Sequence, residues 1–197
     1  MCSSDLEFDK TQTFGNLARS FAGESQAGLR YQFIAQLAMK QGYKTLSDEI
    51  KYIARNETAH AKIIFDTIIE KNGNTENIDI SAGYPFEGDT IENGLLAAAE
   101  AEAAEIKIYR QFSETAANEG YKDISDLFLR IADVEERHET IFRYLYENFR
   151  NGTLFSGDKD IIYECSNCGF RFTAKQAFSV CPLCKVSQGF VKIKLPE

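Results

Sequence analysis

The sequence ETAH at residues 57–60 recurs as EERH at residues 135–138, and these two stretches decide the fold. They contain both histidines of the 197-residue chain and lie 78 residues apart. Since residues i and i+3 share one face of an α-helix, each stretch predicts a glutamate and a histidine directed at a common point. Each helix can therefore supply two ligands to one site.

A shift of 78 residues aligns much more than these two motifs. Both halves of the chain read Glu-x6-Tyr, then Gly-Tyr-Lys, then Glu-x2-His, at identical spacing. The aligned pairs are Glu24 with Glu102, Tyr31 with Tyr109, Glu57 with Glu135, and His60 with His138. The chain therefore contains a duplicated helical hairpin, and we expect its two copies to be related by a pseudo-twofold axis.

Four helices are expected over residues 11–40, 45–71, 89–118 and 122–149, because apolar residues recur there at helical spacing. The link at 72–88 is long for a connection between helices. It can span roughly 55–60 Å, whereas a helix of about 27 residues is roughly 40 Å long. The link can therefore run the length of a bundle and set the second and third helices parallel. This is the single-crossover arrangement of ferritin-like four-helix bundles.

The repeated glutamates fall at one level of such a bundle. Glu24 and Glu57 lie 18 and 15 residues from Gly42, and Glu102 and Glu135 lie equally far from Gly120. Four carboxylates in a bundle core repel one another and lose hydration unless cations compensate them. Two divalent metals satisfy this requirement, and mixed oxygen and nitrogen ligands suit iron or manganese.

Three further residues lie on the faces that carry these ligands. Tyr31 and Tyr109 follow Glu24 and Glu102 by seven residues, so they either hydrogen-bond the metal-bound carboxylates or pack in the apolar core. Glu105 follows Glu102 by three residues, but its counterpart in the first half is Ala27. A seventh ligand on one side only would make the two metals inequivalent, which favours redox chemistry over storage. The alternative is a solvated glutamate.

The last part of the chain carries four of its five cysteines in the pattern C-x2-C-x12-C-x2-C. Two such knuckles predict a tetrahedral four-thiolate site for zinc or for a single iron, with disulfides as the alternative. We expect a helical domain over 1–150, a linker over 151–160 and a small β-rich metal domain over 161–197, with a closing strand at 190–195. The ligands are Cys165, Cys168, Cys181 and Cys184, and Cys2 is interpreted as an unrelated free thiol.

Composition excludes several classes of protein. A net charge of −8 argues against nucleic-acid binding. No stretch of 18 apolar residues predicts a membrane span, and residues 1–7 do not resemble an export signal, so a cytoplasmic protein is expected. Residues 159–197 carry a formal charge of +3 and the remainder −11, which suggests two modules that attract one another.

The repeated glutamate-rich bundle followed by two cysteine knuckles resembles the rubrerythrin family over essentially the whole chain. The resemblance implies a di-iron domain followed by a rubredoxin-like iron domain, with zinc as a possible substitute in the latter. It implies a non-haem peroxidase that reduces hydrogen peroxide to water in oxidative-stress protection. The resemblance further implies a head-to-tail homodimer. Electrons would pass through the rubredoxin-type iron from an external donor, either a rubredoxin or an NAD(P)H-dependent reductase.

The family pattern also implies roles for individual residues. Glu57 and Glu135 would bridge the two irons, with Glu24 and Glu102 as terminal ligands beside His60 and His138. Glu105 and His60 would exchange on one iron between oxidised and reduced states. Lys185 departs from the family pattern, because rubredoxins usually have glycine after the fourth cysteine. Two other functions remain open: a ferritin-like iron-sequestering ferroxidase with a structural zinc ribbon, and an oxygen-activating di-iron oxidase.

Overall fold

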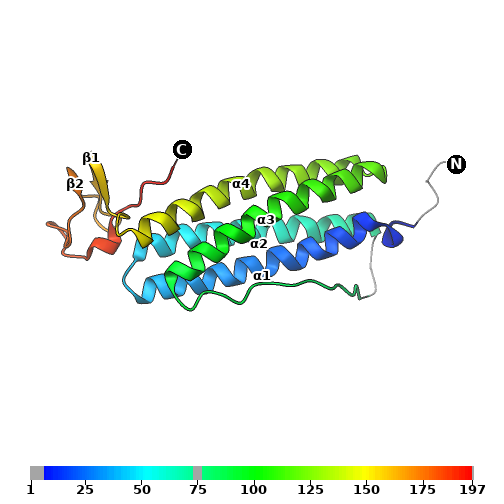
Figure 1. The fold of residues 1–197 in the computed structure, drawn as a ribbon, viewed down its shortest axis with the longest axis horizontal. Coiled ribbons are helices and arrows are strands. Elements are labelled where there is room, and N and C mark those ends of the chain that lie inside the picture. The colour runs from blue at the N-terminus through cyan, green and yellow to red at the C-terminus, as the bar shows by residue number, and fades with distance from the viewer. Residues whose placement is uncertain (1–6, 73–76, 197) are drawn as a thin grey trace.

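A computed structural model describes residues 7–72 and 77–196, so Cys2 lies outside the described residues. Four long helices form one bundle, and a small β-hairpin module sits at one end of it (Figure 1). This confirms the predicted ferritin-like bundle with a small C-terminal module. The helices are α1 (Gln12–Lys40), α2 (Lys44–Asn72), α3 (Ile91–Asn118) and α4 (Lys122–Arg150).

The two copies of the hairpin begin and end on the same local signals. Thr11 and Thr90 cap α1 and α3, since their hydroxyl oxygens accept hydrogen bonds from the backbone N–H groups of Phe14 and Asn93. Gly42 and Gly120 follow α1 and α3 with φ angles of 88° and 90°, a left-handed backbone that glycine adopts without steric cost. The duplicated sequence therefore encodes the duplicated turn.

The crossover sets the topology of the bundle. Residues 77–90 run in an extended conformation along the bundle from the far end of α2 to the start of α3 (Figure 1). As a result α2 and α3 point the same way, while each helix is antiparallel to its partner within a hairpin. This confirms the single-crossover topology expected from the length of the link.

The core of the bundle consists of two apolar clusters with polar residues between them. One cluster contains Leu46, Leu95 and Phe142 and extends into the C-terminal module. The other contains Leu17, Ile64 and Phe128 at the opposite end of the bundle. The repeated glutamates and histidines occupy the level between these clusters, where all six are buried.

The C-terminal module contains an antiparallel pair of strands, β1 (Ser156–Glu164) and β2 (Arg171–Gln176). Because β1 begins at Ser156, the second half of the stretch expected as a linker is already strand. The expected closing strand over residues 190–195 is wrong. Residues Gln188–Phe190 form a 3-10 turn, and within the described residues that follow, one bridge pairs Val191 with Cys165.

Among the described residues, pairing in this segment is limited to two backbone hydrogen bonds, from Ser166 N–H to the Phe190 carbonyl and from Lys192 N–H to the Glu164 carbonyl, and the Val191 carbonyl faces the bundle instead. The Thr45 hydroxyl of α2 donates to the Val191 carbonyl oxygen at 2.7 Å and lies 3.2 Å from that of Gly189. Around this contact the module packs apolar side chains, Phe155 and Val191 among them, onto the bundle core. No ion pair joins module and bundle within residues 7–72 and 77–196. Apolar packing, together with hydrogen bonds from Thr45 and Arg137 to backbone carbonyl oxygens, therefore docks the module within one chain.

Gly189 makes this docking sensitive to a single methyl group. A Cβ atom at Gly189 would lie 1.8 Å from the Gly42 carbonyl oxygen, a backbone atom that has no flexible end to move. We expect Gly189→Ala to separate the module from the bundle and to lower the midpoint of thermal unfolding by about 5–10 °C. Limited proteolysis should then cut between the two parts. Ser187→Ala, at an exposed neighbouring position, is the matched control and should leave both measurements unchanged.

None of the described helices combines the length and the hydropathy needed to cross a membrane.

Candidate metal centres

Each helix of the bundle delivers its predicted residues to one buried level. Glu24, Glu57, Glu102 and Glu135 have no exposed surface, and His60 and His138 are 8% and 3% exposed. The ligand atoms form two groups, each within 4.8 Å. The first group is Glu24, Glu57, His60 and Glu135, and the second is Glu57, Glu102, Glu135 and His138.

Glu57 and Glu135 belong to both groups, whereas the other four residues belong to one each. A carboxylate has two oxygens, so each shared residue has one acceptor atom available for each group. The remaining residues divide into two pairs, one in each group: Glu24 with His60, and Glu102 with His138. The two histidine rings lie 5.9 Å apart, centroid to centroid, on the two sides of this arrangement.

The two pairs are not equivalent. His60 Nδ1 lies 3.2 Å from Glu24 Oε2 and 3.0 Å from Glu135 Oε1. His138 Nδ1 lies 2.6 Å from Glu135 Oε2 and 2.9 Å from Glu57 Oε1, but 4.0 Å from Glu102 Oε1. The pseudo-twofold repeat is therefore followed in the placement of the ligands but not in their detailed contacts.

Four buried carboxylates are concentrated in this layer, where the two histidines are the only basic side chains among the six residues of the two groups. Burial, followed by repulsion from neighbouring carboxylates, raises the pKa of Glu57 and of Glu102 well above the usual range. Burial opposes the charge of His60, yet the carboxylates of Glu135 and Glu24, 3.0 and 3.2 Å from its Nδ1 atom, raise its pKa to about 10. Such a layer favours a cation over empty space.

Unpaired atoms identify where a cation fits. Both carboxylate oxygens of Glu57 and of Glu135 are buried and make no well-aligned hydrogen bond. The same holds for Glu102 Oε2 and for His138 Nδ1, although His138 Nδ1 lies 2.9 Å from Glu57 and 2.6 Å from Glu135. Buried polar atoms are nearly always paired, so a cluster of unpaired ligand atoms indicates coordination that a metal would complete. Oxygen and imidazole nitrogen donors in this number suit two iron or manganese ions.

Tyr31 and Tyr109 hydrogen-bond carboxylates of the opposite hairpin. The Tyr31 hydroxyl of α1 donates to Glu102 of α3 at 2.6 Å, and the Tyr109 hydroxyl of α3 donates to Glu24 of α1. Both rings also pack in the apolar clusters, so the two predicted alternatives are both realised. Each tyrosine therefore orients a terminal carboxylate across the pseudo-twofold axis.

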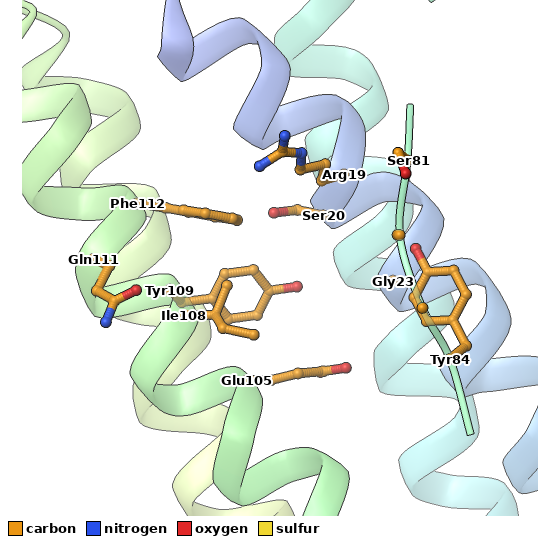
Figure 2. A pocket seen from close by; sticks show the side chains of 12 residues that line it. Arg19, Ser20, Gly23, Ser81, Tyr84, Glu105, Ile108, Tyr109, Gln111 and Phe112 are labelled. Atoms are coloured by element: carbon orange, nitrogen blue, oxygen red, sulfur yellow. The ribbon is translucent and has the colours of Figure 1, made fainter. Parts of the chain in front are cut away.

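Glu105 lies outside both groups of ligand atoms. Its carboxylate lines a cavity between α1, α3 and the crossover, and its Oε2 atom is buried without a partner (Figure 2). Burial, followed by repulsion from Glu24 and Glu135, raises its pKa to about 8. Glu105 is therefore a half-buried neighbour of the ligand layer whose Oε2 atom is out of reach of solvent, contrary to the alternative of a solvated glutamate.

The four cysteines form a second candidate site in the C-terminal module. Their sulfur atoms lie within 4.8 Å of one another. The sulfur atoms of Cys165 and Cys184, and those of Cys168 and Cys181, are 3.7 Å apart, well beyond the roughly 2.05 Å of a disulfide bond. The arrangement fits a tetrahedral four-thiolate site and excludes the disulfide alternative.

The two knuckles have the same backbone, although one lacks glycine. Gly169 and Lys185 follow the second and fourth cysteines with φ angles of 73° and 64°. Their N–H groups donate to the carbonyl oxygens of Cys165 and Cys181 at 2.9 and 3.0 Å. Hydrogen bonds from the Asn167 side chain and the Val186 backbone lower the pKa of Cys184 to about 6. Lys185 therefore keeps the turn that rubredoxins build with glycine, at some backbone strain.

Several residues around the ligand layer could not be predicted from the sequence. Gly23, Ser20 and Tyr84 line the cavity beside Glu105. The sequence carries no signal for them, because none belongs to the motifs aligned by the repeat and Tyr84 lies in the crossover, which has no counterpart in the repeat. They become visible only once the crossover is placed against α1 and α3.

Fold and sites together define a class: a ferritin-like carboxylate bundle that carries a rubredoxin-like four-cysteine module. Comparisons with known proteins agree. The rubrerythrin family model matches residues 15–146 and 93–166, and the model of the rubrerythrin rubredoxin-like domain matches residues 163–190. The chain belongs to the rubrerythrin family.

Individual relatives cover nearly the whole chain. It is 39% identical over 186 residues to Rubrerythrin-1 of Clostridium acetobutylicum, covering 93% of this chain and 94% of that protein. It is 36% identical over 182 residues to rubrerythrin of Porphyromonas gingivalis, covering 91% and 88%. Among solved structures, nigerythrin in a mixed-valence state superposes with a TM-score of 0.62 at 22% identity, covering 97% and 90%. A bacterioferritin of Mycobacterium tuberculosis superposes with a TM-score of 0.64 at 17% sequence identity, covering 74% of this chain and 90% of that one. At such low identity, both structures support the fold alone.

Proposed function

We propose that this protein is a peroxidase that reduces hydrogen peroxide to water and protects the cell against oxidative stress. The observation that carries the proposal is the asymmetry at Glu105. A half-buried glutamate stands beside a complete set of candidate ligands, on one half of the repeat only, and faces a cavity. Iron storage gives no reason for such an extra ligand, whereas a centre that cycles between two redox states uses one.

The ligand set assigns a role to each residue of the bundle. We propose that Glu57 and Glu135 bridge two iron ions, that Glu24 and His60 complete one, and that Glu102 and His138 complete the other. When bound in the ferrous state, the two ions supply the two electrons that, with two protons, convert one hydrogen peroxide to two waters. In the structure His60, rather than Glu105, contacts Glu24. We propose that Glu105 takes this position when the centre is oxidised.

Electrons are proposed to reach the bundle through one iron in the four-cysteine site. The module sits beyond the α1–α2 turn, whereas Glu57 lies 13 residues into α2, about 20 Å along the helix. A path within one chain is therefore long. A head-to-tail homodimer would bring the module of one copy to the bundle of the other, so we propose that assembly. The electron donor is proposed to be a rubredoxin or an NAD(P)H-dependent reductase. Four reduced cysteines support a cytoplasmic location.

Metal analysis with visible spectroscopy on anaerobically prepared protein tests the metal assignment. We expect three iron ions per chain and a red protein, because thiolate-to-iron charge transfer absorbs visible light. A colourless module that contains zinc would contradict the electron relay. That result would favour a ferritin-like ferroxidase with a structural zinc ribbon.

Glu105 offers a test of the proposed exchange of ligands. Glu105→Ala should retain both iron ions in the bundle, since six other ligands remain, and should slow turnover with peroxide about tenfold to a hundredfold. The control is Glu100→Ala, which changes an exposed glutamate of the same helix. Unchanged turnover in Glu105→Ala, with iron content confirmed, would show that Glu105 has no part in the reaction.

A further inference from the structure

The cavity that Glu105 lines has a volume of about 380 Å³ and opens to solvent on one side. Figure 2 shows its walls: Glu105, Tyr109 and Phe112 extend from α3 toward α1, and the crossover runs along the other side with Ser81 and Tyr84. Tyr109 is the residue whose hydroxyl bonds Glu24. The cavity therefore leads from solvent to the edge of the ligand layer.

Three polar atoms in this wall have no hydrogen-bond partner. They are the Ser20 hydroxyl of α1, the Tyr84 hydroxyl of the crossover, and Glu105 Oε2 of α3. Ser20 is 3% exposed, so water at the surface does not satisfy it. Buried hydroxyls without a partner are rare in folded proteins, and they indicate a bound water or a small polar ligand. The two hydroxyls are not part of the ligand set, so a metal does not account for them.

Gly23 keeps the cavity open on the α1 side. It lies one residue before Glu24 in α1 and is buried, yet a Cβ atom placed there would meet no atom within 4 Å. A larger side chain at this position would therefore project into the cavity rather than into the packed core. Glycine in the middle of a helix costs roughly 0.5–1 kcal/mol of stability relative to alanine. The open cavity beside Gly23 offers a reason why glycine occupies this position despite that cost.

We propose that this cavity is the route by which the substrate reaches the bundle centre, and that Ser20 and Tyr84 bind the substrate there. The inference rests on the function proposed above. The cavity offers hydroxyls that donate and a carboxylate oxygen that accepts, so it selects a small molecule with both donors and acceptors. Hydrogen peroxide has both, whereas molecular oxygen has no hydrogen to donate to Glu105.

The route is tested with Gly23→Leu, and Gly15→Leu is the matched control on the same helix, where a Cβ atom also meets nothing within 4 Å. Nitric oxide is the probe, because its binding to the reduced di-iron centre is followed by absorbance without any turnover. We expect Gly23→Leu to slow nitric oxide binding and the reaction with peroxide at least about tenfold, with iron content unchanged. Rates equal to those of Gly15→Leu would overturn the route. Gly23→Ala, a smaller change, should give an intermediate rate if the leucine variant does not fold.

The binding role is tested separately with the double variant Ser20→Ala, Tyr84→Phe. Loss of two hydrogen bonds to the substrate should raise KM for peroxide about tenfold, while kcat stays within about twofold. The rates of nitric oxide binding and of reaction with oxygen should not change, because both molecules are only weak hydrogen-bond acceptors and gain little from the two hydroxyls. An unchanged KM would overturn the role of the two hydroxyls. A wild-type protein that fails to reduce peroxide would refute the proposed function, whereas the nitric oxide rates would still decide whether the cavity is the route.

Discussion

Glu57→Gln is expected to remove both metal ions from the bundle. Glu57 belongs to both groups of ligand atoms, so the change weakens both sites at once, while glutamine preserves its size. Turnover with peroxide should fall by at least about a thousandfold, and iron in the four-cysteine site should remain. Metal analysis and the visible spectrum separate the two kinds of site.

Glu57→Gln should harm metal binding and turnover, yet it should stabilise the metal-free protein. Both oxygens of Glu57 are buried without partners, and its neighbours Glu135 and Glu24 repel its charge. Removing that carboxylate should therefore raise the free energy of unfolding of the metal-free bundle by about 1–2 kcal/mol. Glu70→Gln, at an exposed position of the same helix, should change neither quantity. A metal-free protein that is destabilised by Glu57→Gln would refute the electrostatic description of the site.

Cys181→Ser is expected to have the second largest effect on turnover. It should stop electron transfer to the bundle without changing the reaction of the reduced bundle centre with peroxide. Cys181 is fully buried and belongs to the four-sulfur group. A module this small has little core of its own, so loss of its metal should unfold it. Steady-state turnover with an external donor should drop at least about a hundredfold.

A single turnover isolates the bundle from the module. When Cys181→Ser is reduced chemically and mixed with peroxide, the di-iron centre should react at the wild-type rate. Ser166→Ala changes an exposed residue between the first two cysteines and is the control for both measurements. If steady-state turnover of Cys181→Ser equals that of the wild type, the relay through this module is wrong.

The repeat explains why so much could be predicted from sequence. Helical spacing predicts helices, and a duplicated Glu-x2-His fixes their relative height, because equal distances from Gly42 and Gly120 bring the ligands to one level. The length of the link then leaves a single crossover as the topology. Local signals that act through the backbone, such as the turns after α1 and α3, are read directly from the residues.

The features that escaped prediction depend on contacts between distant segments. Apolar and polar residues alternate in the segment 190–195 as they do in a strand, yet the carbonyl oxygen of Val191 accepts a hydrogen bond from Thr45 of α2. The cavity beside Glu105 exists only because the crossover passes over α1 and α3 there. Neither contact can be predicted from the spacing of residues in the sequence. The charge difference between bundle and module suggested an electrostatic contact. Within one chain, however, apolar side chains pack across this contact and no ion pair joins the described residues of the two parts.

A single turnover shows whether peroxide is the substrate of the bundle centre. Anaerobically reduced protein is mixed in a stopped-flow instrument with hydrogen peroxide or with oxygen, and reoxidation is followed by absorbance. We predict much faster reoxidation by peroxide, with one peroxide consumed per di-iron centre. Faster reoxidation by oxygen would contradict the account and would favour an oxygen-activating oxidase.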